Sequence, residues 1–116
     1  MTTHEMYPAM SRELGTKRAA LAPRAEAAFR ALNEAVFADG ALPAKTKQLI
    51  AVAAAHVTQC PYCIRGHTRA ALRAGATRAE IMEAIWVAAE MRAGAAYAHS
   101  ALALDAMDEL EKRSAA

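Results

Sequence analysis

Apolar residues recur at helical spacing along most of the chain, and turn residues separate one run from the next. The first run predicts a helix from Pro23 to Val36 that ends near Gly40, because proline is favoured in a first helical turn. Pro43 precedes a second helix over residues 44–57. That segment is apolar on nearly every side, so we expect it to be buried between neighbours.

The second half of the chain predicts three more helices. One covers residues 61–73, and Gly75 provides its C-terminal cap. Thr77 and Glu80 have the spacing of a capping box, which begins the next helix. We expect a kink at residues 92–94, followed by a last helical stretch to about residue 112. Each boundary is set by a local signal.

Composition favours an all-α fold, a helical bundle in a single domain. The sequence has 33 alanines in 116 residues and is 55% hydrophobic but only 5% aromatic. Alanine is the best helix former, and a chain of this length fits one domain. Residues 1–116 are therefore expected to form one unit, with residues 1–20, which contain Pro8 and Gly15, as an N-terminal extension.

Charge and hydropathy exclude several classes of partner. The net charge is only +2, and the 14 basic and 12 acidic residues are scattered, so no nucleic-acid partner is expected. The longest apolar run, residues 49–55, is far shorter than the ~18 residues that a membrane span needs. Without a signal-peptide pattern, a cytoplasmic location is expected. Alanine-faced helices bury little area each, so we expect a homo-oligomer.

The segment Cys60-Pro61-Tyr62-Cys63 holds both cysteines of the chain, and His67 follows. With Pro61 in the first helical turn, Cys60 is the N-cap, and Cys63 and His67 lie one turn apart on one face. A thiolate at a helix start meets unpaired N–H groups, which lower its pKa. An imidazole within reach of Cys63 can take its proton.

Other interpretations of this segment are weaker. A zinc site would use Cys60, Cys63 and His67 and need a fourth ligand, and no spacing points to His56 or His99. Glutaredoxins carry the same tetrapeptide after a β-strand, whereas a helix is predicted before it here. Two inert, buried cysteines remain the simplest alternative. We expect no metal and no cofactor.

With its Cys-x-x-Cys-x-x-x-His motif placed between helices, the segment 42–99 resembles the AhpD-like, carboxymuconolactone decarboxylase family of alkyl hydroperoxidases. The resemblance implies an all-α fold, a trimer or hexamer, and reduction of a hydroperoxide or a disulfide. It also implies that Cys63 attacks the peroxide, Cys60 resolves the sulfenic acid and His67 belongs to a proton relay. An external dithiol protein would then reduce the disulfide.

One position departs from that family. A glutamate commonly stands twelve residues before the first cysteine, where this chain has Gln48, which cannot exchange a proton. Glu83, Glu90 and His99 are the candidates to replace it, although all three also suit a solvated or packing role. Two functions remain beside peroxidase activity within the family: a protein disulfide reductase, and a lactone decarboxylase, which needs no dithiol. A non-catalytic assembly module is the alternative from another class.

Overall fold

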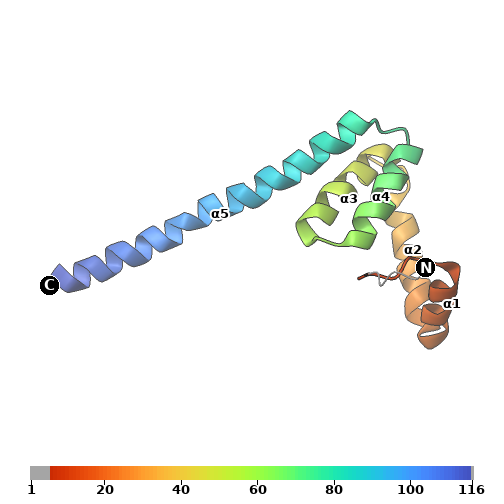
Figure 1. The fold of residues 1–116 in the computed structure, drawn as a ribbon, viewed down its shortest axis with the longest axis horizontal. Helices are drawn as coiled ribbons and strands as arrows, with labels where there is room; N and C mark the ends of the chain where they lie inside the picture. The colour runs from red at the N-terminus through yellow and green to blue at the C-terminus, as the bar shows by residue number, and fades with distance from the viewer. Residues whose placement is uncertain (1–5, 116) are drawn as a thin grey trace. The chain divides into compact units, whose positions relative to one another are not determined.

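The computed structural model describes residues 6–115, and every regular element in that range is an α-helix, which confirms the all-α prediction (Figure 1). The chain divides into two compact units, one up to Ala44 and one from Lys45 onward. No helix within residues 6–115 has the length and apolarity to cross a membrane. The five helices are α1 (Arg12–Leu21), α2 (Pro23–Phe37), α3 (Ala44–Thr58), α4 (Pro61–Arg73) and α5 (Arg78–Ala115).

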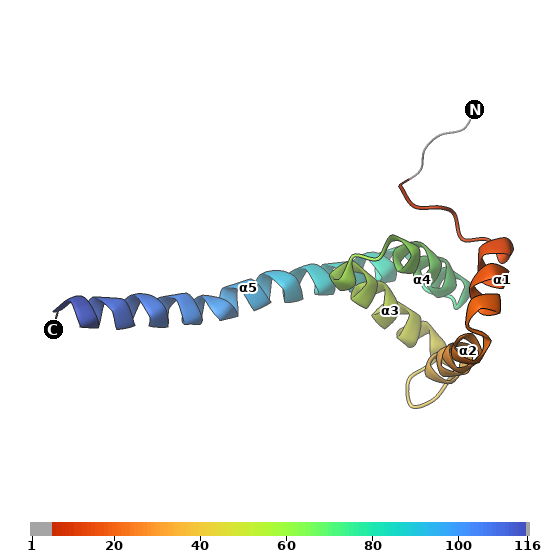
Figure 2. The same cartoon turned by 90° about the horizontal axis from the view of Figure 1, so that it is seen from below.

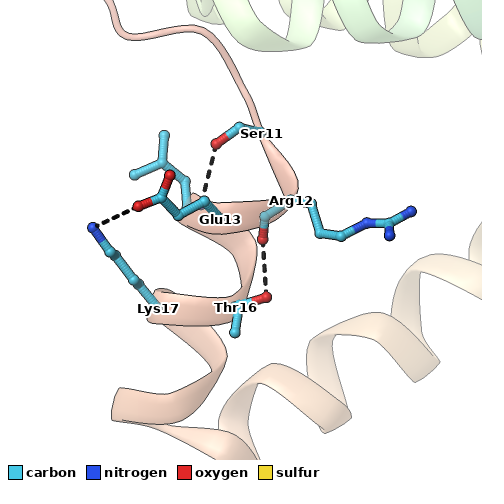
Figure 3. A network of polar contacts seen from close by, with 6 residues as sticks. Ser11, Arg12, Glu13, Thr16 and Lys17 are labelled. Atoms are coloured by element: carbon cyan, nitrogen blue, oxygen red, sulfur yellow. Dashed lines mark hydrogen bonds and ion pairs between the residues drawn. The ribbon is translucent and has the colours of Figure 1, made fainter.

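Helix α1 was not predicted from the sequence. Its start is capped by Ser11, whose hydroxyl accepts a hydrogen bond from the backbone N–H of Leu14 at 3.2 Å. Glu13 and Lys17 form an ion pair one turn apart at 3.3 Å, as Figure 3 shows. Gly15 lies inside the helix, and no residue of α1 is buried. The cap and the ion pair therefore support this helix together with its contacts to α2, and none of its residues is buried.

Helix α2 begins at Pro23, as predicted, and ends at Phe37. None of its residues is buried, and Phe29 and Leu32 stay exposed. After α2, the carboxylate of Asp39 accepts a hydrogen bond from the backbone N–H of Ala44 at 2.7 Å. This bond caps the start of α3, because the first N–H groups of a helix have no partner within it.

The second unit consists of α3, α4 and α5. In both views α3 and α4 lie side by side, and the first turns of α5 join them (Figures 1 and 2). The core is small and built mainly of short side chains. Its buried cluster contains Val52, Ala71, Ala76 and Ile81, with Leu49 and Ile85 packed against it.

The predicted kink at residues 92–94 is wrong, because α5 continues through it for 38 residues. A single glycine lowers helix stability by only about 1 kcal/mol, and the residues around Gly94 are mostly alanine. From Met91 to Ala115 every residue except Gly94 is exposed. Helix α5 therefore packs through its first turns and leaves its second half uncovered in this chain.

The start of α5 confirms the predicted capping box. The backbone N–H of Thr77 donates to Oε1 of Glu80 at 2.8 Å, and the N–H of Glu80 donates to the Thr77 hydroxyl at 3.1 Å. Lys45 of α3 adds an ion pair to Oε2 of Glu80 at 2.8 Å. The carboxylate of Glu80 therefore links the start of α5 to the start of α3. Between α4 and α5, Gly75 adopts the left-handed conformation, with φ of +95°.

We predict a pH-dependent contribution of Glu80 to stability. The hydrogen bond from Lys45, followed by that from the Thr77 backbone, holds the pKa of Glu80 below its ordinary value. Because the folded pKa is lower than the unfolded value of about 4.3, this contribution is present above that pH and disappears as the pH falls through the folded pKa. Thermal unfolding of Glu80→Gln should therefore show a lower Tm than the wild type near pH 7.

The difference between the two melting temperatures should shrink as the pH falls below about 4 and through the folded pKa, because the carboxyl of the wild type then becomes protonated. Glutamine preserves the capping box, so the substitution removes only the charge. Glu111→Gln, on the exposed end of α5, is the matched control and should change little. A Tm difference that stays constant from pH 3 to pH 7 would contradict this assignment.

Candidate functional site

Cys60 is the N-cap of α4, as the sequence predicted. Its backbone is extended, and its Sγ accepts a hydrogen bond from the backbone N–H of Cys63 at 3.3 Å. Pro61 occupies the first helical turn, where a missing N–H has no consequence. The sulfur of Cys60 thus takes the place that a serine or aspartate oxygen takes in most helix caps.

The turn between α3 and α4 fixes the position of Cys60. Gln59 adopts the left-handed conformation with φ of +57°, and the N–H of Cys60 donates to the carbonyl of Ala55 at 3.2 Å. This arrangement is a Schellman-type helix end, in which glycine is the usual residue. A non-glycine residue in the left-handed region costs roughly 1–2 kcal/mol. Contacts outside the turn must therefore support Gln59.

Arg92 of α5 supplies that support. Its Nη1 donates at 3.5 and 3.4 Å to the carbonyls of His56 and Val57, which lie in the last turn of α3, where carbonyls have no partner within the helix. With the amide of Gln59 turned so that its oxygen faces the guanidinium, that oxygen accepts from Nη2 at 3.2 Å. No sequence pattern indicated this role of Arg92, because the residues in contact are 35 and 36 positions apart along the chain.

The hydrogen bond between the two cysteine side chains shifts their pKa values in opposite directions. The Cys63 thiol donates to Cys60, and this bond, together with the one from the Cys63 backbone, holds the pKa of Cys60 below its ordinary value. The same thiol bond raises the pKa of Cys63, and burial and the nearby Cys60 charge raise it further. Both residues are half-buried free cysteines. Cys60 is therefore the more acidic cysteine of the pair and Cys63 the less acidic one.

His67 lies one turn after Cys63 on α4 and contacts α3 through its ring. Its Nδ1 is 2.8 Å from Oε1 of Gln48, and both side chains are partly buried. The structure thus pairs the histidine of the motif with the position at which the sequence departs from the family pattern. The spacing along the chain did not indicate this contact, since the two residues are 19 positions apart.

The other candidates lie apart from this cluster. Glu83, Glu90 and His99 are exposed on α5, and within residues 6–115 none of them forms a hydrogen bond to Cys60, Cys63 or His67. Oε1 of Glu90 lies near Gly94 of its own helix. Among the described residues, no three histidine, cysteine or acidic side chains are grouped so that they could hold a metal ion.

Comparison with known sequences identifies similar proteins over most of the chain. The sequence model of the carboxymuconolactone decarboxylase family matches residues 23–106, a wider range than residues 42–99. An uncharacterized protein encoded in the cox locus of Paracoccus denitrificans is 69% identical over 84 residues, which are 72% of this chain and 76% of that protein. An uncharacterized protein of Cupriavidus necator is 45% identical over 83 residues, which cover 70% and 74%.

Solved structures give the same result. A protein from Methanobacterium thermoautotrophicum has a TM-score of 0.68 at 37% identity, covering 72% of this chain and 93% of that one. A carboxymuconolactone decarboxylase family protein from Legionella pneumophila has a TM-score of 0.64 at 38% identity, covering 81% and 84%. A family protein from Thermotoga maritima, for which a part in an antioxidative response has been suggested, has a TM-score of 0.53 at 32% identity, covering 87% and 94%.

We predict that Cys60 reacts with an alkylating reagent at lower pH than Cys63, because only the thiolate is nucleophilic. Limited iodoacetamide treatment between pH 6 and 9, followed by peptide mass spectrometry, should find the label first on Cys60. Cys63→Ala removes the thiol donor and should move the titration of Cys60 to higher pH. The unfolded protein, in which both thiols are ordinary, is the control. Faster labelling of Cys63 would contradict the charge assignment.

Proposed function

The chain belongs to the carboxymuconolactone decarboxylase family, and from that premise we propose that it is a dithiol oxidoreductase that reduces hydroperoxides through Cys60 and Cys63. The observation that carries the proposal is the hydrogen-bonded cysteine pair at the start of α4, in which the pKa of Cys60 is lowered and that of Cys63 is raised. Such a pair stores the two electrons that the reaction consumes, so the proposed reaction needs no cofactor.

The oxidation takes place in two steps. Cys63 gives up its proton to His67, and its sulfur then attacks one oxygen of the hydroperoxide. An S–O bond forms as the O–O bond breaks. The alkoxide that is released takes a proton and leaves as an alcohol. The product is a sulfenic acid on Cys63. The thiolate of Cys60 then attacks that sulfur, the S–S bond forms as the S–O bond breaks, and the sulfenic oxygen leaves as hydroxide, which takes a proton from solvent to become water. An external dithiol protein returns the pair to its reduced form by exchange.

The hydrogen bond between the two cysteines supports the second step. The thiol of Cys63 donates to the sulfur of Cys60, which holds the two sulfurs next to each other. Once Cys63 is oxidised, the low pKa of Cys60 supplies the second nucleophile without a further base. Both sulfurs are partly exposed, which leaves them open to a substrate.

A second function, reduction of a protein disulfide, is favoured by one observation. The first cysteine of the motif has the lowered pKa and the second the raised one. This order of acidity suits a reaction in which Cys60 attacks a partner disulfide and Cys63 resolves the mixed disulfide. Rates measured separately with a hydroperoxide and with a protein disulfide distinguish the two functions.

We also propose that the protein is a homo-oligomer. Helix α3, which the sequence pattern predicts to be buried all round, leaves Ile50 53% exposed in this chain. On α5, Trp86 is 68% exposed, and Leu102 and Leu110 are exposed to a similar extent. A second copy of the chain that covers these residues would add the apolar burial that the small core of the second unit does not supply.

Stoichiometric oxidation tests the proposed reaction. One equivalent of a hydroperoxide, followed by intact-mass measurement without reductant, should remove two hydrogens from the wild type without linking chains. Cys63→Ser should form no intrachain disulfide and should not turn over peroxide, whereas Cys60→Ser should stop at a sulfenic acid that dimedone traps. Sustained peroxide turnover by Cys63→Ser would contradict the proposal. A sulfenic acid in Cys63→Ser, with none in Cys60→Ser, would transfer the attack to Cys60.

Light scattering tests the assembly. We expect the wild type at micromolar concentration to have a mass that is a multiple of 12.3 kDa. Leu102→Glu combined with Leu110→Glu should lower that mass, because each places a charge in the apolar face of α5. Glu111→Lys changes the charge at a polar position of the same helix and serves as the control. A wild-type mass of one chain would contradict the proposal.

A further inference from the structure

We infer that Gln48 is a positioning residue for the dithiol reaction: its side-chain oxygen holds the proton of His67 on Nδ1 and leaves Nε2 as the only basic atom of the ring. The inference rests on the proposed function, because it assigns the atom through which His67 takes the proton of Cys63. It differs from a relay, in which residue 48 would itself receive a proton.

The contact between the two side chains determines which nitrogen carries the proton. Nδ1 of His67 and Oε1 of Gln48 are 2.8 Å apart, a normal hydrogen-bond length between two partly buried groups on adjacent helices. An amide oxygen can only accept, so the nitrogen facing it must donate. A neutral imidazole has a single N–H, and the lone pair is therefore on Nε2.

An amide orients the ring but cannot take part in proton transfer. It has no ionisable proton near neutral pH and no charge with which to stabilise an imidazolium, whereas a carboxylate has both capacities. A proton taken by Nε2 from Cys63 therefore cannot pass on to residue 48. It leaves from the same nitrogen, to the alkoxide released when the O–O bond breaks. His67 thus serves as base and then as acid without a carboxylate at position 48, and Gln48 keeps its ring in the required state.

Two other histidines of the chain provide internal references. Nδ1 of His56 is 2.7 Å from the backbone carbonyl of Val52, which can only accept, so His56 must also hold its proton on Nδ1. His99 is exposed and has no hydrogen bond within residues 6–115. Its ring should show the mixture of tautomers of a solvated imidazole. The state of His67 can thus be compared with both inside one protein.

Nitrogen-15 NMR of the reduced protein at about pH 8, where an ordinary histidine is neutral, measures the tautomers directly. In the wild type we expect His67 to match His56, with its signal assigned by its loss in His67→Gln. In Gln48→Leu, which has similar size and no acceptor, His67 should move toward the pattern of His99. Gln48→Glu keeps an acceptor at the same place and should retain the proton on Nδ1.

The rate of dithiol oxidation by a hydroperoxide measures the effect on the reaction. Gln48→Leu should slow it by about tenfold, less than the ~100-fold or more that general acid–base catalysis contributes, because some rings still adopt the productive tautomer. Gln48→Glu should restore at least the wild-type rate. Unchanged thermal unfolding of both variants would show that the fold is intact.

Two results would overturn the inference. The first is a wild-type His67 that is protonated on Nε2, as expected if the amide presented its NH₂ group to Nδ1. The second is a Gln48→Leu protein that has the wild-type tautomer or the wild-type rate. If the wild type is not oxidised by hydroperoxide at all, the proposed function fails. The NMR comparison still decides in that case whether Gln48 sets the tautomer.

Discussion

The hydrogen bonds that meet at the sulfur of Cys60 are the interaction on which the chemistry of this site depends. The N–H and the thiol of Cys63 both point at that sulfur, and they make Cys60 the more acidic cysteine and Cys63 the less acidic one. They require Cys60 to lie just outside the regular helix, which the left-handed Gln59 makes possible. Arg92 in turn holds the end of α3 and the side chain of Gln59.

Local signals predicted the parts of the fold that depend on a few neighbouring residues. The starts of α2 and α4 at proline, the cap at Cys60 and the capping box at Thr77 all follow from side chains within one turn. The same approach missed α1, in which Gly15 masked a helix formed by its cap and ion pair, and it broke α5 at a glycine that the surrounding alanines tolerate. The contacts of Arg92 and Gln48 could not be predicted, because they depend on how separate helices pack.

The face of α5 that packs against the core explains why its two acidic candidates, Glu83 and Glu90, lie away from the two cysteines. Ile81 and Ala88 are the buried residues of this helix, and they face the core of the second unit. Glu83 and Glu90 each follow one of them by two positions, which is about 200° around a helix that turns 100° per residue. Their carboxylates therefore lie on the side opposite the core. The sequence contained this periodicity, but identifying the core face required knowing which apolar residues were buried.

The placement of Cys60 at the start of α4 also bears on the reduction potential of the cysteine pair. Hydrogen bonds at that position stabilise a sulfur that carries negative charge, and the neutral sulfur of a disulfide gains less from them. In the dithiol oxidoreductase proposed above, this difference favours the reduced pair and makes the reduction potential more positive.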